Sequence, residues 1–397
     1  MSFASLSSAP SGLIKRENFC LAWAAFGLYF FLSAFFWASG PAPLRTVFYL
    51  FLLIPFLLVL PWRKFHGEEY GSHYTLAALT FAGYSVLASL WGDASAFGFF
   101  FKQWVFLAFW LCGLSWLFYH RPVDLQRLYL MIMIVGAVCA LGSVYYFYIY
   151  QQHPIALRLN GLGLSENSTV VAQIFGVAAL LAYIGSLQTS NWKLSPLYFM
   201  LALACAVPVL MSQTRGTVVA LILVGFVAAL IVRPQWRIWV SQMVLAIVVV
   251  TALFLLTDMV DVLQARGISL SYRDVIWLEL LERAQENPVF GIGYAENSRI
   301  VVDAYEFHHA HNSWVDILYY GGLVGLALSM WHGLLLLRGF SRDEDILPLY
   351  LWLAYGCICL FSNGSSLLTR PDQQWFMYWV PAGILAAVVM SRRRCQT

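Results

Sequence analysis

Long apolar runs recur along this chain from Phe19 to its C-terminal end. A helix of roughly 20 apolar residues crosses the hydrocarbon core of a bilayer, about 30 Å, because each residue advances it by about 1.5 Å. The composition agrees: 61% of the residues are hydrophobic, only 11% are charged, and the mean hydropathy is +0.72. Soluble domains carry about 25% charged residues. The sequence therefore predicts an all-α polytopic membrane protein.

The apolar runs predict about twelve transmembrane helices. Their expected positions are 19–38, 44–62, 73–92, 97–119, 128–150, 168–187, 196–212, 216–233, 237–257, 313–337, 346–363 and 375–391. The seventh and eighth are separated only by the polar turn from Ser212 to Gly216, which favours a hairpin over one broken helix. We expect three parts: residues 1–257 with nine helices, the long loop 258–312, and residues 313–397 with three helices and a basic tail.

Lysine and arginine predict the orientation, since cytoplasmic loops retain basic residues. With a cytoplasmic N-terminus, 14 of the 23 basic residues lie on the cytoplasmic side and nine on the other. Four of those nine lie in the long loop, which this rule discounts. We therefore expect both termini in the cytoplasm and the long loop outside it. The first 18 residues lack a cleavable signal pattern, so the first helix is expected to be an uncleaved anchor.

The long loop has its own pattern. Ser271 to Asp274 has capping-box spacing and opens an amphipathic helix, which Asn287-Pro288 stops. Glu279 and Arg283 can pair within it at i,i+4. The glycine-rich run from Pro288 to Tyr294 follows, and we favour a chain reversal there over a phosphate-binding turn.

A histidine cluster, His308-His309-Ala310-His311, ends the loop where the tenth helix begins. Histidine titrates near neutrality, so it can act as a general base at a membrane boundary. A metal site with Asp303 and Glu306 is the alternative. We do not expect one, because adjacent histidines point apart and six of the seven cysteines lie inside predicted helices.

Arginines on the expected outer side predict a phosphate site, because the guanidinium fork donates two hydrogen bonds to one phosphate and stays charged. Arg215 lies in the short turn between two apolar helices, where carbonyl capping is the alternative role. Arg273 lies in the first helical turn of the loop, where the helix dipole disfavours a structural arginine. Second-rank candidates, for each of which a solvated or acid-paired role is the alternative, are Arg158, Arg266 and Arg370.

Three segments together resemble one family. His311-Asn312, nine residues and then Gly322 and Gly325 are similar to the pattern His-Asn/Ser/Gln, nine arbitrary residues, Gly-x-x-Gly of bacterial O-antigen ligases, the WaaL group of the Wzy_C-type superfamily. The segment from Ser212 to Gly216 resembles the Ser-x-x-Arg-Gly turn of that superfamily. The segment 273–293 resembles a run of the same superfamily, in which an arginine and then a tryptophan precede Pro-Leu-Phe-Gly-x-Gly. Valine stands here in place of the leucine.

The resemblance implies a GT-C-like glycosyltransferase of the bacterial inner membrane with a periplasmic active site. It would move a polysaccharide from undecaprenyl diphosphate to a sugar hydroxyl of the lipid A core in lipopolysaccharide biosynthesis, with inversion and without metal, cofactor or nucleic acid. His311 would be the general base, and Asn312 would orient it or a sugar hydroxyl. The diphosphate would contact Arg215 and Arg273, and Arg158, Arg266 and Arg370 would be further contacts. Gly321, Gly322 and Gly325 would allow close helix packing.

Other functions share parts of this pattern. A Wzy-type polymerase uses the same donor with a second lipid-linked chain as acceptor, and a protein O-glycosyltransferase is related but usually larger. A polysaccharide or lipid transporter is the alternative from another class. It would carry charges at mid-membrane or paired broken helices, whereas the charges here lie near the predicted helix ends.

Overall fold

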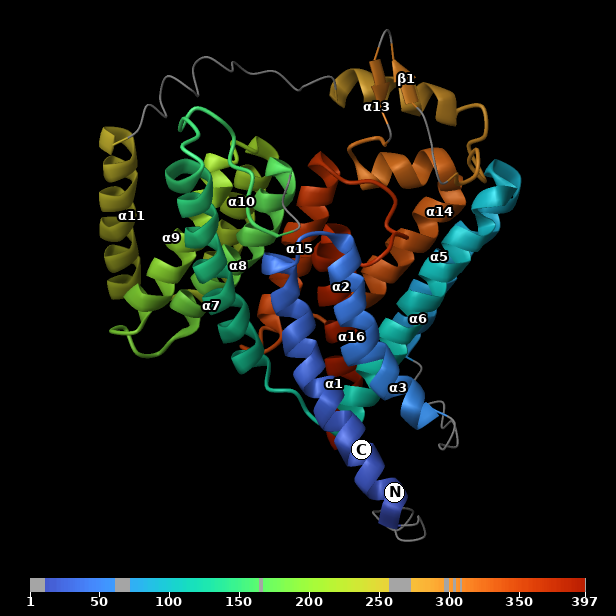
Figure 1. Ribbon diagram of the computed structural model, residues 1–397, viewed down its shortest axis with the longest axis horizontal. Helices are drawn as coiled ribbons and strands as arrows, with labels where there is room; N and C mark the ends of the chain where they lie inside the picture. The colour runs from blue at the N-terminus through green and yellow to red at the C-terminus, as the bar shows by residue number, and fades with distance from the viewer. Residues whose placement is uncertain are drawn as a thin grey trace.

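The computed structural model describes residues 11–60, 72–163, 167–256, 273–295, 300–302, 305–307 and 309–396. Within these ranges the chain is a bundle of helices with one short hairpin at its edge (Figure 1). Its α-helices are α1 (Ser11–Trp37), α2 (Pro41–Phe48), α3 (Ile54–Val59), α5 (His73–Gly92), α6 (Phe97–His120), α7 (Leu125–Val144), α8 (Ser168–Gln188), α9 (Ser195–Met211), α10 (Arg215–Val232), α11 (Trp236–Leu256), α13 (Arg273–Ala284), α14 (Ser313–Arg338), α15 (Leu347–Ser362) and α16 (Val380–Gln396). Short 3-10 or π-helical turns extend some of them: η2 (Tyr49–Leu53), η4 (Ala94–Ala96), η5 (Tyr145–Tyr150) and η6 (Trp375–Trp379).

Every predicted span coincides with helical structure. Nine segments among the described residues are long and apolar enough to cross a membrane. The remaining three predicted spans coincide with α9, α11 and α15, of which α9 and α15 are shorter apolar helices. α9 and α10 are separate helices on either side of the Ser212–Gly216 turn. The prediction of an all-α polytopic membrane protein is confirmed.

Aromatic side chains fill the core between α1, α6 and the C-terminal helices. Trp110 of α6 donates a hydrogen bond to the Trp379 carbonyl oxygen (2.9 Å), so its indole N–H is satisfied inside the apolar interior. The rings of Phe35 and Phe376 stack with centroids 4.5 Å apart. α8 is buried along almost its whole length. α8 packs on α10 and η6 packs on α15, so this core supports two of the helices that carry the polar site described below.

α13 and a β-hairpin cover the end of the bundle opposite to both termini (Figure 1). α13 buries Ile276, Leu280 and Ala284, which are spaced four residues apart and therefore share one face. The hairpin pairs β1 (Ile300–Val302) with β2 (Tyr305–Phe307) in antiparallel register. The amphipathic helix in the long loop is confirmed, although Ser271, its predicted cap, lies outside the described residues.

The predicted i,i+4 ion pair on α13 is also confirmed. Arg283 Nε lies 2.7 Å from Glu279 Oε1, and the pair raises the pKa of Arg283. The same guanidinium donates to the Val301 carbonyl oxygen through Nη2 (3.1 Å). Arg283 therefore joins α13 to the hairpin.

α14 is broken at Gly322, whose backbone is left-handed (φ 63°, ψ −165°). The run from Pro288 to Gly293 enters this break. The amides of Leu323 and Val324 donate to the carbonyl oxygens of Pro288 (2.8 Å) and Val289 (3.1 Å), while the amides of Ile292 and Gly293 donate to Tyr319 (3.1 Å) and Tyr320 (2.9 Å). The run thus supplies backbone partners that the broken helix lacks. The alternative of a phosphate-binding turn is wrong for the amides of Ile292 and Gly293, because both already donate hydrogen bonds within the protein.

The glycines at this junction allow backbones to touch. A Cβ on Gly322 would lie 2.4 Å from the Val289 carbonyl oxygen, and one on Gly291 would lie 2.5 Å from the Gly322 amide nitrogen. A Cβ on Gly325 would lie 3.3 Å from a ring carbon of Tyr84 on α5. Gly325 thus lies close to α5, as the predicted helix packing requires, whereas Gly322 allows the close approach of the Pro288–Gly293 run and not of a helix.

Candidate active site

His311 lies directly before α14, and its imidazole contacts the end of α15. Its Nδ1 is 3.0 Å from Oδ1 of Asn363, the residue that caps the C-terminal end of α15. An amide oxygen only accepts hydrogen bonds, so Nδ1 carries the ring proton and Nε2 keeps its lone pair. The ring is therefore oriented as a base that accepts a proton at Nε2.

The backbone at His311 is in an uncommon conformation. Its φ of 53° is left-handed, a region that costs a residue with a side chain about 1–3 kcal/mol and that clusters at functional sites. The His311 amide donates to Nδ1 of His309 (3.1 Å), which helps to hold this turn. His309 thus contacts the backbone of His311, while His308 lies outside the described residues.

Both backbone polar groups of Ala310, the residue before His311, have partners. Trp277 of α13 donates from Nε1 to the Ala310 carbonyl oxygen (3.0 Å), and the carboxylate of Asp316 accepts from the Ala310 amide. Asp316 is almost completely buried in the first turn of α14. These two contacts join the loop, α13 and α14 at the residue that precedes the histidine.

Asn312 is the N-cap of α14. Its Oδ1 accepts from the amides of Trp314 (3.0 Å) and Val315 (3.3 Å), two of the four groups that a helix start leaves unsatisfied. The side chain is only 1% exposed. Asn312 therefore holds the start of α14 in place, and a direct contact of its side chain with sugar stays a prediction.

Arg273 lies close to His311 because of its position on α13. It precedes Trp277 by four residues and therefore shares the helix face that Trp277 turns toward Ala310 and toward Phe361 of α15 (ring centroids 5.5 Å apart). Burial lowers the pKa of His311, the positive charge of Arg273 lowers it further, and the hydrogen bond to Asn363 opposes both effects. At neutral pH the imidazole is therefore uncharged, the form that a general base requires.

Arg215 is the first residue of α10 and is exposed. The neighbouring Gly216 packs on the end of α15: a Cβ on it would lie 2.7 Å from Cβ of Ser362, the residue before Asn363. Because Asn363 contacts His311, the turn with Arg215 and the histidine belong to one region. The structure thus brings together Arg215, Arg273 and His311 from three distant parts of the sequence.

Arg158 braces the turn that carries Arg215. Its Nε donates to the Ser212 carbonyl oxygen (2.9 Å), and its Nη2 donates to Oγ1 of Thr214 (3.1 Å). Gln213, in a left-handed conformation (φ 55°), donates from Nε2 to the Ala156 carbonyl oxygen (3.1 Å). Arg158 therefore has a structural role, and its predicted contact with phosphate stays a prediction.

The other two candidate arginines differ in what the structure says of them. Arg370 is exposed in the connection between α15 and η6, the segment that begins with Asn363. Its charge lies close enough to Asp372 to lower the pKa of that carboxyl, although burial dominates and raises it to about 6. Arg266 lies outside the described residues. A phosphate contact stays a prediction for both.

Two site residues escaped the sequence analysis. Asn363 stands beside Gly364 in a polar connection, where an Asn-Gly pair is typical of a turn, so its contact with His311 had no local signal. Asp316 did have one, because it is an isolated carboxylate in an apolar helix, five residues after His311. Among the described residues, no group of three or more His, Cys, Asp or Glu side chains is arranged to hold a metal ion.

The chain has known relatives. Residues 199–330 match the O-antigen ligase family model. An O-antigen ligase of Pseudomonas aeruginosa is 27% identical over 375 residues, which cover 91% of this chain and 89% of that protein. The segment that matches the family model contains Arg215, Arg273 and His311. Both matches confirm the resemblance derived from the sequence.

Proposed function

We propose that the chain is an O-antigen ligase, which transfers a polysaccharide from undecaprenyl diphosphate to a sugar hydroxyl of the lipid A core. Its matches to the O-antigen ligase family model and to the Pseudomonas aeruginosa O-antigen ligase support this proposal. The observation that carries this proposal is the contact of His311 Nδ1 with Asn363, which leaves Nε2 free to accept a proton beside Arg273. A base next to fixed positive charge suits a reaction in which a hydroxyl attacks and a diphosphate leaves.

The reaction is a direct displacement at the anomeric carbon of the donor sugar. The acceptor hydroxyl oxygen forms the new bond to that carbon while its proton passes to Nε2 of His311. The bond from the carbon to the diphosphate oxygen breaks, and the electron pair leaves with undecaprenyl diphosphate. Attack from the face opposite to the leaving group inverts the configuration at that carbon.

Arg215 and Arg273 would bind the diphosphate. Each guanidinium donates two parallel hydrogen bonds to a phosphate, and the developing charge on the leaving group strengthens these bonds in the transition state. Two fixed cations would thus do what a divalent metal does in other transferases that use lipid-linked sugars. The donor is already activated by its diphosphate, so the reaction needs no nucleotide cofactor.

The position of the site supports this assignment. The site lies where α14 begins and α15 ends, on the side opposite to both termini (Figure 1). With both termini in the cytoplasm, it would face the periplasm and the outer leaflet of the inner membrane. Two lipid-anchored substrates can meet there without leaving the bilayer. The turn with Arg215 lies at the start of α10, and Asn363 lies at the end of α15. The polar groups of the site therefore gather at a membrane boundary, which favours an enzyme over a transporter.

Complementation tests this function. The chain is expressed in a strain that lacks its O-antigen ligase and in one that lacks its O-antigen polymerase, and lipopolysaccharide ladders are read on gels. We expect a full ladder in the first strain and no rescue in the second. His311→Ala should abolish the ladder, whereas His73→Ala, at an exposed histidine that begins α5, should not. If the protein rescued only the polymerase mutant, the acceptor would be a second lipid-linked chain and not the lipid A core.

A further inference from the structure

A polar cavity lies at the far end of the molecule from His311. Its volume is about 290 Å³, and it lies between the end of α8, the turn from α10 to α11 and the connection from α14 to α15. α14 begins at the active site and ends at Arg338, shortly before this connection. The helix ends that line the cavity therefore lie toward the side of the bundle that carries both termini (Figure 1).

The cavity lies at a membrane boundary. α8 and α10 are candidate spans that end at Gln188 and Val232, and both of these residues line it. Trp236, at the start of α11, is 70% exposed, and Trp239 is also exposed. Exposed tryptophans are typical of the level of the lipid headgroups.

Two arginines line the cavity. Arg233 follows the end of α10, Arg342 lies in the connection from α14 to α15, and both are exposed. Glu344 is the one carboxylate residue in the lining. Neither arginine has an ion pair with a carboxylate within the part of the chain that the structure describes.

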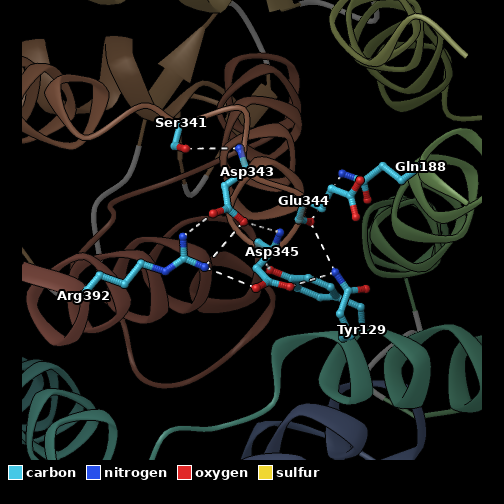
Figure 2. A network of polar contacts seen from close by, with 8 residues as sticks. Tyr129, Gln188, Ser341, Asp343, Glu344, Asp345 and Arg392 are labelled. Carbon is cyan, nitrogen blue, oxygen red and sulfur yellow. Dashed lines mark hydrogen bonds and ion pairs between the residues drawn. The ribbon is translucent and has the colours of Figure 1, made fainter. Parts of the chain in front are cut away.

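Two acidic neighbours of Arg342, Asp343 and Asp345, already have other partners (Figure 2). Arg392 of α16 binds the carboxylate of Asp343 and, at 3.2 Å, that of Asp345. Gln126 of α7 donates to Asp345 Oδ1 (3.0 Å). Asp343 and Asp345 are thus held by groups outside the cavity, whose lining keeps two arginines against the single carboxylate of Glu344.

The same network fixes the connection that carries Arg342. The Glu344 carbonyl oxygen accepts from Gln188 of α8 (3.3 Å), and the Asp345 carbonyl oxygen accepts from the Tyr129 hydroxyl of α7 (2.6 Å), as Figure 2 shows. Contacts from two helices, α7 and α8, hold the backbone at Glu344 and Asp345. The connection thus presents Arg342 on a rigid support, which reduces the ordering that binding would cost.

We propose that this cavity binds the phosphate of an anionic phospholipid headgroup from the surrounding leaflet. Two guanidinium groups suit a phosphate diester, and basic pockets between transmembrane helices are typical binding sites for anionic headgroups. The volume is close to the lower end of ligand pockets, about 300 Å³. Phe226 and Leu230 of α10 are exposed on one helix face that leads toward Arg233, and they provide an apolar surface for the acyl chains. This site is separate from the proposed transfer reaction.

Lipid binding to the purified full-length protein tests the proposal. Native mass spectrometry and thermal unfolding in detergent compare phosphatidylglycerol with phosphatidylcholine of the same acyl chains and with inorganic phosphate. We expect phosphatidylglycerol alone to be retained and to raise the unfolding temperature. The double variant Arg233→Gln/Arg342→Gln should weaken this binding by about tenfold or more, because two charged hydrogen-bonding groups are lost. Arg127→Gln, at an exposed arginine paired with Asp124 outside the cavity, should leave it unchanged.

Several results would overturn the assignment. Equal stabilisation by phosphatidylcholine, which carries the same phosphate diester next to a choline cation, would show that the cavity does not select an anionic headgroup. Equal stabilisation by inorganic phosphate would remove the lipid from the proposal. Unchanged lipid binding in the double variant would show that the lipid binds at another site. A competition on the wild-type protein avoids variants altogether: from an equal mixture of the two lipids it should retain phosphatidylglycerol, and equal retention would contradict the proposal.

Discussion

The imidazole Nδ1 of His311 lies 3.0 Å from Oδ1 of Asn363, a residue 52 positions further along the chain. The histidine stands at the start of α14 and the asparagine at the end of α15. The protonation pattern of the ring thus depends on how these two helices pack, and α13 adds a third constraint through Trp277 and Ala310. A base built in this way is oriented before substrate arrives.

Asn363→Ala should lower the rate of glycan transfer by about tenfold to a hundredfold, less than the full contribution of a general base, about a hundredfold to ten-thousandfold, because the base itself remains. The variant removes the acceptor for the Nδ1 proton, so the ring is no longer held with Nε2 toward the acceptor. Asn363→Asp keeps an oxygen acceptor but adds negative charge, which should raise the pKa of His311 and move the acid limb of the pH profile to higher pH. Transfer assays with purified protein measure both effects. Wild-type rates and profiles in both variants would contradict the assigned tautomer.

Arg273→Gln should change the pH profile as well as the rate. The neutral form of His311 is the active one, and its pKa lies below the ordinary value of 6.5 because of burial and of the Arg273 charge. Wild-type activity should therefore persist down to pH values below 6.5 and fall when the pH passes the lowered pKa. Without the positive charge this pKa rises, so the loss on acidification should begin at higher pH.

Arg273→Lys is the matched control for this profile. Lysine keeps the charge, so the acid limb should stay near its wild-type position, while loss of the bidentate fork should still lower the rate. An acid limb that moves equally in the glutamine and lysine variants would show that Arg273 acts on His311 through packing and not through its charge.

The fold was largely predictable, because an apolar run of bilayer length is a local property of the sequence. All twelve predicted spans coincide with helical structure. The break in α14 was not predicted. It depends on the run from Pro288 to Gly293, which supplies hydrogen bonds to residues on both sides of Gly322. A contact between segments about 30 residues apart leaves no periodic signal.

The site was predictable to a smaller extent. Residue type and position singled out His311, at a membrane boundary, and Arg273, in a first helical turn where the helix dipole disfavours a structural arginine. The structure places the two close together, and their roles stay predictions. Arg158 shows the limit of that reasoning. Its guanidinium group binds the backbone and side chain of the Ser212–Gly216 turn, and only coordinates distinguish such a brace from a phosphate contact.

Arg215→Lys should lose most of the transfer activity, because lysine keeps the charge but not the planar fork that binds a phosphate twice. The variant should fold normally, since Arg215 is exposed at the start of α10. Arg158→Lys is the comparison: it should lower the unfolding temperature, because the brace on Ser212 and Thr214 is lost. Near wild-type activity in Arg215→Lys would point to a simple surface charge.

Transfer by the purified protein should persist in the presence of a strong chelator. The proposed diphosphate site uses arginines, whose charge does not depend on an added ion. Activity is measured before and after chelation, and again after addition of Mg²⁺ or Mn²⁺. A loss that either ion restores would assign a divalent cation to the reaction and would revive the metal role of the histidine cluster.

Gly322→Ala should destabilise the protein by about 2 kcal/mol or more, because the left-handed backbone disfavours alanine and its Cβ would lie 2.4 Å from the Val289 carbonyl oxygen. Gly333→Ala, in the same helix, is the matched control, since a Cβ there meets nothing within 4 Å. Alanine forms helix more readily than glycine by about 1 kcal/mol, so this variant should be as stable as wild type or more stable. Thermal unfolding in one detergent compares them. Equal stability of both variants would mean that the Pro288–Gly293 run does not depend on the break in α14, and that the helix tolerates an ordinary residue at Gly322.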